Sequence, residues 1–395
     1  MAETSMLDIP QSSKSKPQAA SGRSPIERAL DQPFNLGLFL PIHKGGWTPS
    51  AIPRETDWRF AYNSDLTRRA EAAGFDLVFA LAQWLSKGGM GGKIEFRDNS
   101  LESFMTVASL APVTSRIMLI STVHVLYGPW HPLFLAKMGA TLDHISGGRW
   151  GINVVTGSRP QERPMFGLPP IDHDLRYDMI AEFADIIDRL WTIDENLTFD
   201  GRFWKTQDAY VSPRPTYRRP VMVNAGNSMP SQRYAARYSD FIFITSPAGA
   251  EIDAALDALP ALHASIREQA AAAGRPQLRS IINPMVICRE TEAEARDIYN
   301  RTVEMGDPEA ASGMMVKGDA QSWRGHTQKQ RVVGGNIHLV GTPEQVVDQM
   351  LKLKKAGCGG IQLTFIDFQP ELEFFIARVL PLMHQAGLRI STDSG

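Results

Sequence analysis

The stretch PLFLAKMGATLDHISGGRWGINVVTG, residues 132–157, contains one complete step of the architecture that we predict for this chain. Residues 132–145 have a helical pattern and begin with proline, a residue favoured in the first turn of a helix. Residues 150–155 follow as a short apolar strand. A helix that leads directly into an apolar strand is typical of α/β proteins.

The same alternation runs through most of the chain. Further strand-like segments are predicted at residues 34–41, 77–81, 117–125, 221–225, 241–245, 281–288 and 360–365. Helical patterns lie at residues 59–73, 100–110, 175–191, 231–238, 250–273, 291–305 and 343–356. Short, nearly continuous apolar strands indicate a parallel sheet buried on both faces. Eight of them favour a (β/α)₈ TIM barrel with insertions over an open, doubly wound sheet.

Four segments complete the predicted domain organisation. Residues 1–31 are rich in small and polar residues and are predicted to be a disordered tail. Residues 32–388 form the barrel, and residues 389–395 form a C-terminal tail. Residues 307–336 are polar and glycine-rich and show no helical or strand period, so we interpret them as a lid loop.

Composition excludes several classes of function. The net charge of −2 argues against a nucleic-acid binder and against a polybasic membrane anchor. The chain has no apolar run long enough to span a bilayer and no signal-peptide core. Its only cysteines, Cys288 and Cys358, favour a reducing compartment, so we expect a cytoplasmic protein. The sequence contains no metal-ligand spacing, no nucleophile elbow and no dinucleotide-binding glycine motif.

Polar residues at the ends of three predicted strands are candidates for a site, because barrel sites lie at the carboxyl ends of the strands. Asn153 interrupts an apolar strand, and it is either a satisfied core residue or a ligand for a flavin and oxygen. Thr122 and His124 share one face of the preceding strand, where strand propensity and packing are the alternatives to a role in the site. The turn containing Gly226 and Ser228 leads into a helix start, which suits a phosphate or is a plain connection.

Longer motifs extend these observations. The stretches GGKIEFRDNSLESF (91–104), VTSRI (113–117) and ISGGRWGINVVTG (145–157) resemble the FMN-dependent pyrimidine monooxygenases. The stretch GPWHP (128–132) and residues 336–382, including LVGTPEQ (339–345), are more similar to the dimethylsulfone and alkanesulfonate monooxygenases. Both groups belong to the luciferase-like flavin-dependent monooxygenases, and the resemblance covers residues 34–383.

The resemblance implies a two-component oxygenase. Such an enzyme takes diffusible reduced FMN from an NAD(P)H-dependent flavin reductase and uses O₂ as co-substrate. Its relatives form a flavin peroxide, in several cases at N5. The implied reaction cleaves a C–N or C–heteroatom bond in a pyrimidine-like, heteroaromatic or amide substrate. The alternative is C–S cleavage in a sulfone or sulfonate. A homodimer or homotetramer is also implied.

The resemblance also assigns roles to individual residues. The residues that match FMN contacts of the family are Ala82, Gln83, Thr122, Asn153, Glu162, Arg176, Tyr177, Gly226 and Ser228. Arginine and tyrosine suit a phosphate dianion. Thr122 matches the threonine beside flavin N5, where oxygen is held, and Thr122 and Asn153 are the candidate catalytic residues because both can donate hydrogen bonds to a developing anion.

One departure concerns the substrate. Residues 84–90 are about three residues longer than the matching loop of the pyrimidine enzymes, which puts uracil itself in doubt. The candidate substrate contacts are Trp47, Trp84, His124, Trp130, Trp323 and Arg324. Two other functions compete with oxygenation on the same barrel. One is a deazaflavin-dependent dehydrogenase, and the other is a catalytically idle flavin-binding protein.

Overall fold

The computed structural model describes residues 22–157, 159–314, 323 and 325–390. Eight parallel strands close into a barrel in the order β1-β12-β9-β8-β7-β4-β3-β2. Their bounds are β1 (Asn35–Phe39), β2 (Leu77–Ala80), β3 (Met118–His124), β4 (Trp150–Val155), β7 (Val221–Ala225), β8 (Phe241–Ile244), β9 (Arg279–Ile282) and β12 (Gly360–Leu363). All eight overlap predicted strands, although β9 shares only its last two residues with the predicted segment 281–288, and the predicted TIM barrel is confirmed.

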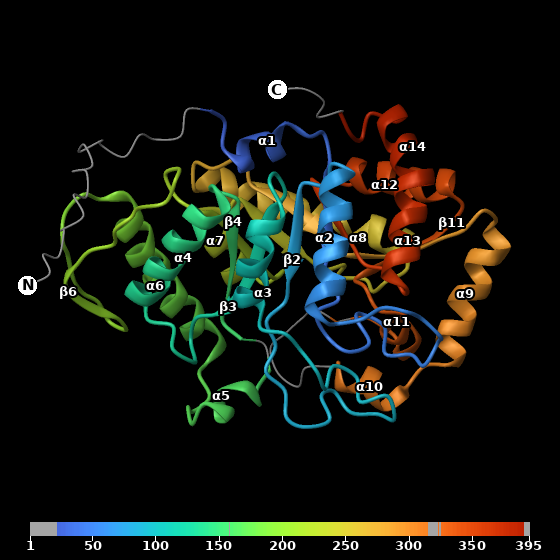
Figure 1. Cartoon of the computed structure of the whole chain (residues 1–395), viewed down its shortest axis with the longest axis horizontal. Helices are drawn as coiled ribbons and strands as arrows, with labels where there is room; N and C mark the ends of the chain where they lie inside the picture. The colour runs from blue at the N-terminus through green and yellow to red at the C-terminus, as the bar shows by residue number, and fades with distance from the viewer. Residues whose placement is uncertain (1–21, 158, 315–322, 324, 391–395) are drawn as a thin grey trace, which may run out of the picture.

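Helices surround the barrel, as Figure 1 shows. The long ones are α2 (Phe60–Ala72), α3 (Ser103–Leu110), α4 (Pro132–Ser146), α6 (His173–Thr192), α7 (Met229–Tyr238), α8 (Ile252–Ala272), α9 (Glu292–Glu304) and α12 (Pro343–Lys355). Shorter turns are η1 (Ala111–Val113) and α5 (Glu162–Met165). The core between strands and helices is one continuous cluster, in which Trp150 and Trp191 are among the largest fully buried side chains. Burial of this apolar surface is the main contribution to the stability of the barrel.

Two small sheets lie outside the barrel. The first is the antiparallel pair of β5 (Leu197–Asp200) and β6 (Lys205–Ala209), which forms a hairpin. The run predicted as one strand at residues 281–288 is instead two strands, because it ends its barrel pairing at Ile282. Its second half, β10 (Pro284–Cys288), pairs with β11 (Ile337–Gly341), a strand that the sequence analysis missed.

The predicted tails and lid are partly wrong. Residues 25–31, assigned to the disordered tail, form α1 (Pro25–Asp31), which a capping box at Ser24 and Glu27 begins. Arg389, assigned to the C-terminal tail, is buried. The segment predicted to lack periodicity contains α10 (Pro308–Gly313) and α11 (Gln328–Val333), each started by a side-chain cap. The chain also ends in α13 (Phe368–Phe374), the π-helical turn η2 (Phe375–Val379) and α14 (Leu380–Gln385), which were not predicted. Residues 1–21 of the proposed N-terminal tail lie outside the described residues.

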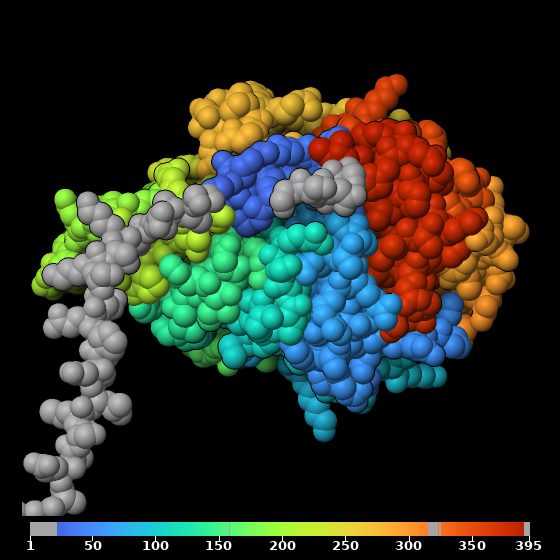
Figure 2. Space-filling view, turned by 45° about the horizontal axis from the view of Figure 1, so that its top comes forward, coloured from blue at the N-terminus to red at the C-terminus, as the bar shows by residue number. Residues whose placement is uncertain are grey.

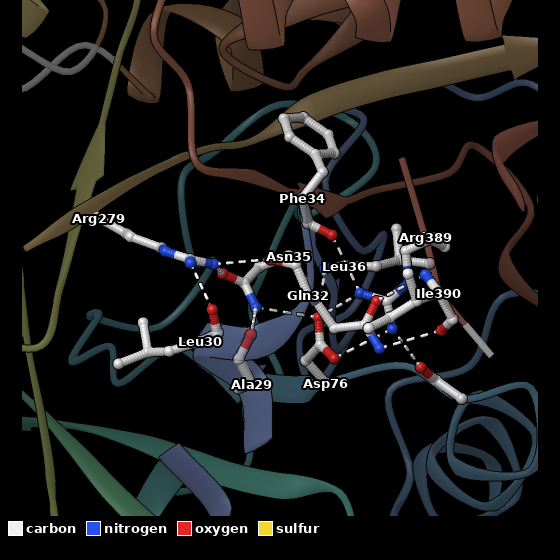
Figure 3. Close-up of polar contacts among 11 residues, drawn as sticks. Ala29, Leu30, Gln32, Phe34, Asn35, Leu36, Asp76, Arg279, Arg389 and Ile390 are labelled. Atoms are coloured by element: carbon white, nitrogen blue, oxygen red, sulfur yellow. Dashed lines mark hydrogen bonds and ion pairs between the residues drawn. The ribbon is translucent and has the colours of Figure 1, made fainter. Parts of the chain in front are cut away.

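A polar network closes the amino-terminal end of the barrel, where α1 and the C-terminal segment lie next to each other (Figures 1 and 2). Asn35 on β1 donates to the carbonyl of Ala29, at 2.7 Å, and accepts from Arg279, at 3.0 Å. Arg389 donates to both carboxylate oxygens of Asp76, at 2.6 and 3.0 Å (Figure 3). This end is therefore sealed by structural contacts, and the opposite end is left for a site.

Candidate active site

The opposite, carboxyl-terminal end of the barrel contains a cavity of about 290 Å³. Its walls come from the ends of the barrel strands and from the segments that follow them. Of the predicted site residues, those that line it are Trp47, Ala82, Gln83, Thr122, His124, Asn153, Glu162, Arg176, Tyr177, Gly226, Ser228 and Trp323. The structure thus gathers twelve side chains or backbone positions that are spread over nearly 280 positions of the chain.

Thr122 and Asn153 form the polar centre of the cavity. They are direct neighbours in the register of β3 and β4, and the side-chain amide of Asn153 donates to Oγ1 of Thr122 at 3.2 Å. Both side chains are buried. The Oδ1 atom of Asn153 is buried and has no hydrogen-bond partner. Buried polar atoms are almost always paired, so this oxygen is placed to accept from a bound molecule.

The period of two along a strand explains this placement. Thr122 and Asn153 point into the barrel mouth. Ser121 and Trp150 lie an odd number of residues away on the same two strands, so they face the helices, where they bond to each other at 3.0 Å. The backbone N–H of Thr122 is further held by Oγ of Ser103, at 2.9 Å. The polar centre therefore sits on two rigid strands rather than on loops.

The turn between β7 and α7 forms a second part of the site. Gly226 has φ +147°, and a Cβ there would come within 2.7 Å of Oγ of Ser231. Ser228 is the N-cap of α7 and accepts from the backbone of Ser231. Glycine is required at this close approach, and Gly226 and Ser228 bring the positive end of the α7 dipole to the cavity wall.

Arg176 and Tyr177 of α6 line the same cavity. Arg176 donates to the carbonyl of Gly157 at 2.7 Å, and the Tyr177 hydroxyl would be 3.6 Å from a Cβ at Gly226. The guanidinium, the phenol and the start of α7 therefore converge, which is a suitable arrangement for an anion.

Glu162 and His124 occupy the wall between these two parts. The hydroxyl of Tyr127 donates to Glu162 at 2.5 Å, and burial together with this carboxylate raises the pKa of Tyr127. The ring of His124 lies 5.0 Å from that of Tyr127, and its Nδ1 is buried without a partner. Burial lowers the pKa of His124, which keeps the imidazole neutral near pH 7.

Two predicted substrate contacts lie elsewhere. Trp84 is 40% exposed and packs edge-to-face on Phe166, and only its backbone N–H reaches Glu162, at 3.4 Å. Trp130 packs between Phe104 and Phe134 at the base of α3 and α4. Neither side chain lines the cavity. Arg324 falls outside the described residues.

Several lining residues were not predicted. Phe79 and Phe243 form an edge-to-face pair in the wall, at 4.8 Å between ring centroids. Arg97 and Arg159 add two guanidinium groups, of which Arg97 is buried and Arg159 is half-buried. Arg97 lies within the quoted motif at residues 91–104, so a charged residue next to a buried phenylalanine was the available signal. Nothing in the local pattern around Arg159 distinguishes it from a solvated loop charge.

Three segments of the chain pack together beside these arginines: residues 90–96, residues 307–314 and Trp323. We call them the cover. Met90, Phe96, Ala310 and Met314 form a separate buried cluster, against which Trp323 packs. Asp307 joins the segments, because its carboxylate accepts from the backbone of Ile94, Glu309 and Ala310 at 3.1–3.3 Å. The segment predicted as a lid therefore contributes a packed wall in its described part.

The described residues contain no metal cluster, no membrane-spanning helix and no disulfide. Within them no group of three or more His, Cys, Asp and Glu side chains could hold a metal ion. None of their helices is both long and apolar enough to cross a membrane. Cys288 and Cys358 are both buried and free.

Comparisons with known proteins identify relatives of this chain. A family model described as luciferase-like monooxygenase matches residues 34–359. The FMNH₂-dependent dimethylsulfone monooxygenase of Pseudomonas putida is 33% identical over 369 residues, which cover 90% of this chain and 97% of that protein. A pyrimidine monooxygenase of Rhizobium rhizogenes is 32% identical over 361 residues, covering 89% and 96%. The crystal structure of DmoA from Hyphomicrobium sulfonivorans superposes with a TM-score of 0.77 at 19% identity, covering 92% of this chain and 90% of the other, and that likeness concerns the fold alone.

Proposed function

We propose, from the premise that this chain belongs to the luciferase-like monooxygenase family, that its cavity oxygenates a small organic molecule beside a bound reduced FMN. The chain is a flavin-dependent monooxygenase that uses reduced FMN and O₂. The observation that carries the assignment of the site is the convergence of an anion-binding turn with the Thr122–Asn153 pair in one cavity.

The residues present fit a flavin. Gly226 leaves room where any Cβ would meet Ser231, so a phosphate can approach the backbone at the start of α7. Arg176, Tyr177 and Ser228 would hold that phosphate. The unpaired Oδ1 of Asn153 accepts an N–H, and a reduced flavin ring carries N–H groups as well as carbonyl groups.

In the proposed site, Thr122 has the central polar role. Its hydroxyl accepts from the amide of Asn153, which leaves the hydroxyl proton for an oxygen atom in the cavity. Reduced FMN, when bound, supplies the two electrons with which one atom of O₂ becomes water while the other enters the substrate. Thr122 and Asn153 would stabilise negative charge on oxygen, since hydrogen-bond donors held in a dry site are most effective there.

The substrate belongs to one of two chemical classes in this proposal. The relatives named above act on pyrimidines and on dimethylsulfone at similar identity, so both classes have support. We place C–N or C–heteroatom cleavage in a pyrimidine-like, heteroaromatic or amide substrate first, and C–S cleavage in a sulfone or sulfonate second. A separate flavin reductase would supply the reduced FMN. Assembly into a homodimer or homotetramer stays a prediction.

The test combines binding and turnover. We expect the protein to bind reduced FMN under anaerobic conditions. Mixed with a flavin reductase, NADH and ¹⁸O₂, it should incorporate one labelled atom into a pyrimidine, amide, sulfone or sulfonate. Tight binding of oxidised flavin with no labelled product from any of these classes would favour a non-catalytic flavin protein. Anaerobic turnover with a deazaflavin would assign the site to hydride transfer.

A further inference from the structure

Arg97 is a buried cation without an anion. Its side chain lines the cavity, and the residue is only 3% exposed. It donates to Oε1 of Gln83 and to the carbonyl of Gly46, both at 3.3 Å, while its Nη2 is buried and has no partner. Among the described residues, no carboxylate lies within 4 Å of its guanidinium.

Arg389 and Arg149, the other two arginines classed as buried among the described residues, are satisfied. Arg389 forms a bidentate pair with Asp76, and Arg149 donates to four carbonyl groups and a hydroxyl. A buried charge is expensive unless it is paired, because water solvates it far better than an apolar interior does. The unpaired Nη2 of Arg97 therefore indicates a partner that is not part of the protein.

Arg159 adds a second positive charge next to the first. It donates to the carbonyl of Gly313 at 3.1 Å and contacts the sulfur of Met90 at 3.6 Å, so it too lacks a carboxylate within 4 Å among the described residues. Burial and the charge of Arg159 lower the pKa of Arg97 to about 9, so Arg97 stays charged at neutral pH. In the described part of the chain, Glu162 is the carboxylate that acts on Arg159, and its charge raises the pKa of Arg159 against the larger effect of burial.

The surroundings of Arg97 shape the space for a ligand. Trp47 lies 4.3 Å from the guanidinium carbon and Phe96 lies 5.1 Å from it, measured to the ring centroids. Met90, Met314 and Trp323 add further apolar lining near Arg159. A ligand at this place would combine an anionic group with a small apolar or planar body.

This place is distinct from the proposed phosphate turn. Arg97 follows β2, whereas Ser228 follows β7, and β3 and β4 separate these two strands in the barrel. The flavin phosphate is already assigned a guanidinium, a phenol and a helix start on the β7 side. Ala82 and Gln83, which follow β2, match flavin contacts of the family, so an anion bound at Arg97 would lie beside the flavin and away from its phosphate.

We propose that Arg97, assisted by Arg159, binds an anionic group of the substrate, so that this enzyme oxygenates a small organic carboxylate or sulfonate rather than a neutral molecule. The inference rests on the proposed function, since it places the substrate in the same cavity as the flavin. It restricts the proposed substrates to anions, and a preference for anions can be measured by binding, without turnover.

The test uses pairs of probes that differ mainly in charge. Methanesulfonate is compared with dimethyl sulfone, and benzoate with benzamide, by calorimetric titration into protein saturated with reduced FMN under anaerobic conditions. The variants are Arg97→Gln, Arg97→Lys and Arg159→Gln. Arg59→Gln, which removes one charge from the exposed surface, is the control. Melting temperature and FMN affinity are measured for every variant.

We expect the anionic member of at least one pair to bind at least tenfold more tightly than its neutral partner. Arg97→Gln should weaken anion binding roughly 10- to 100-fold, with FMN affinity and neutral-probe affinity unchanged. Arg97→Lys should retain part of the preference, Arg159→Gln should reduce it, and Arg59→Gln should leave it intact.

Four results would overturn the inference. They are neutral probes that bind as tightly as anions, no binding of either anion, an undiminished anion preference in Arg97→Gln, or loss of FMN binding in that variant, which would move Arg97 to the flavin phosphate. If Arg97→Gln does not fold, the comparison of Arg97→Lys with Arg159→Gln carries the test. Failure of the unaltered protein to bind FMN would instead refute the proposed function.

Discussion

At the scale of single residues, the Thr122–Asn153 pair makes the sharpest prediction. Asn153→Ala and Thr122→Ala remove a donor or acceptor from the polar centre, so we expect product yield with reduced FMN to fall about 100- to 1000-fold while the fold is retained. Yield is measured as ¹⁸O incorporation, and the fold is followed by circular dichroism.

Ser121→Ala is the matched control for this pair. It lies next to Thr122 but faces the helices, where it accepts from Trp150 at 3.0 Å. We expect it to lower stability by about 1 kcal/mol and to leave the yield unchanged. Unchanged yield in both Asn153→Ala and Thr122→Ala would remove these residues from the mechanism.

Gly226 allows a second prediction at this scale. Gly226→Ala places a Cβ 2.7 Å from Oγ of Ser231 at the proposed phosphate turn, so we expect reduced FMN to bind at least about tenfold more weakly. Gly274→Ala is the control, because Gly274 also has a positive φ but no atom lies within 4 Å of a Cβ there. Equal FMN affinity in the two variants would argue against phosphate binding at this turn.

At the scale of elements, Asp307 joins two segments of the cover, residues 307–314 and the loop that follows β2. Asp307→Ala removes the acceptor of Ile94, Glu309 and Ala310, so we expect both segments to open more often. The readout is cleavage after Lys93 by trypsin under native conditions, which should become several-fold faster.

Thr291→Ala serves as the control for Asp307→Ala. It removes the N-cap of α9 but has no hydrogen bond to the cover. We expect it to lower stability by about 1 kcal/mol without faster cleavage after Lys93. Equally fast cleavage in both variants would show that Asp307 stabilises the whole fold rather than the cover.

The ion pair between Arg389 and Asp76 attaches the C-terminal segment to the sealed end of the barrel. Arg389→Met leaves the Asp76 carboxylate buried without its cation, so we expect the free energy of unfolding to fall by about 3–5 kcal/mol. FMN affinity should not change, because the pair lies at the end opposite the cavity.

Arg378→Met is the control. It breaks an exposed pair with Glu290 and should lower the free energy of unfolding by less than about 1 kcal/mol in the same denaturant titration. Similar losses in both variants would contradict a special role for the buried pair.

At the scale of the whole molecule, buried histidines make stability depend on pH. Burial lowers the pKa of His43, His124, His263 and His338, the last to about 4. The unfolded chain binds protons on these groups below about pH 6.5, whereas the folded chain does not. The free energy of unfolding should therefore fall as the pH is lowered from 6.5 toward 4.

His338→Gln isolates one part of this loss. His338 lies on β11 and bonds to the carbonyl of Gly334 at 2.9 Å. Its depressed pKa contributes about 3 kcal/mol of acid destabilisation, so the pH dependence of the variant should be flatter by about that amount between pH 6.5 and 4. Parallel stability curves for the two proteins would refute this contribution.

The sequence by itself determined the barrel and the polar centre of its site. Apolar periodicity is a local property, so the strands ending near Thr122 and Asn153 could be predicted, and the strand period placed both side chains at one end. The resemblance to a family added Glu162, Arg176 and Tyr177. Short capped helices such as α1 and α10 were missed, because polar segments of six or seven residues carry little periodicity.

Only the tertiary structure decided which charges lack partners and which aromatic side chains reach the cavity. Trp84 and Trp130 follow strands that end at the site, yet they pack on Phe166 and on Phe104. Arg97 and Arg159 are 62 positions apart, and the packing of three loops brings buried Arg97 next to half-buried Arg159. Solvation and ion pairing are set by everything that surrounds a charge, and neighbours distant in sequence supply most of that environment.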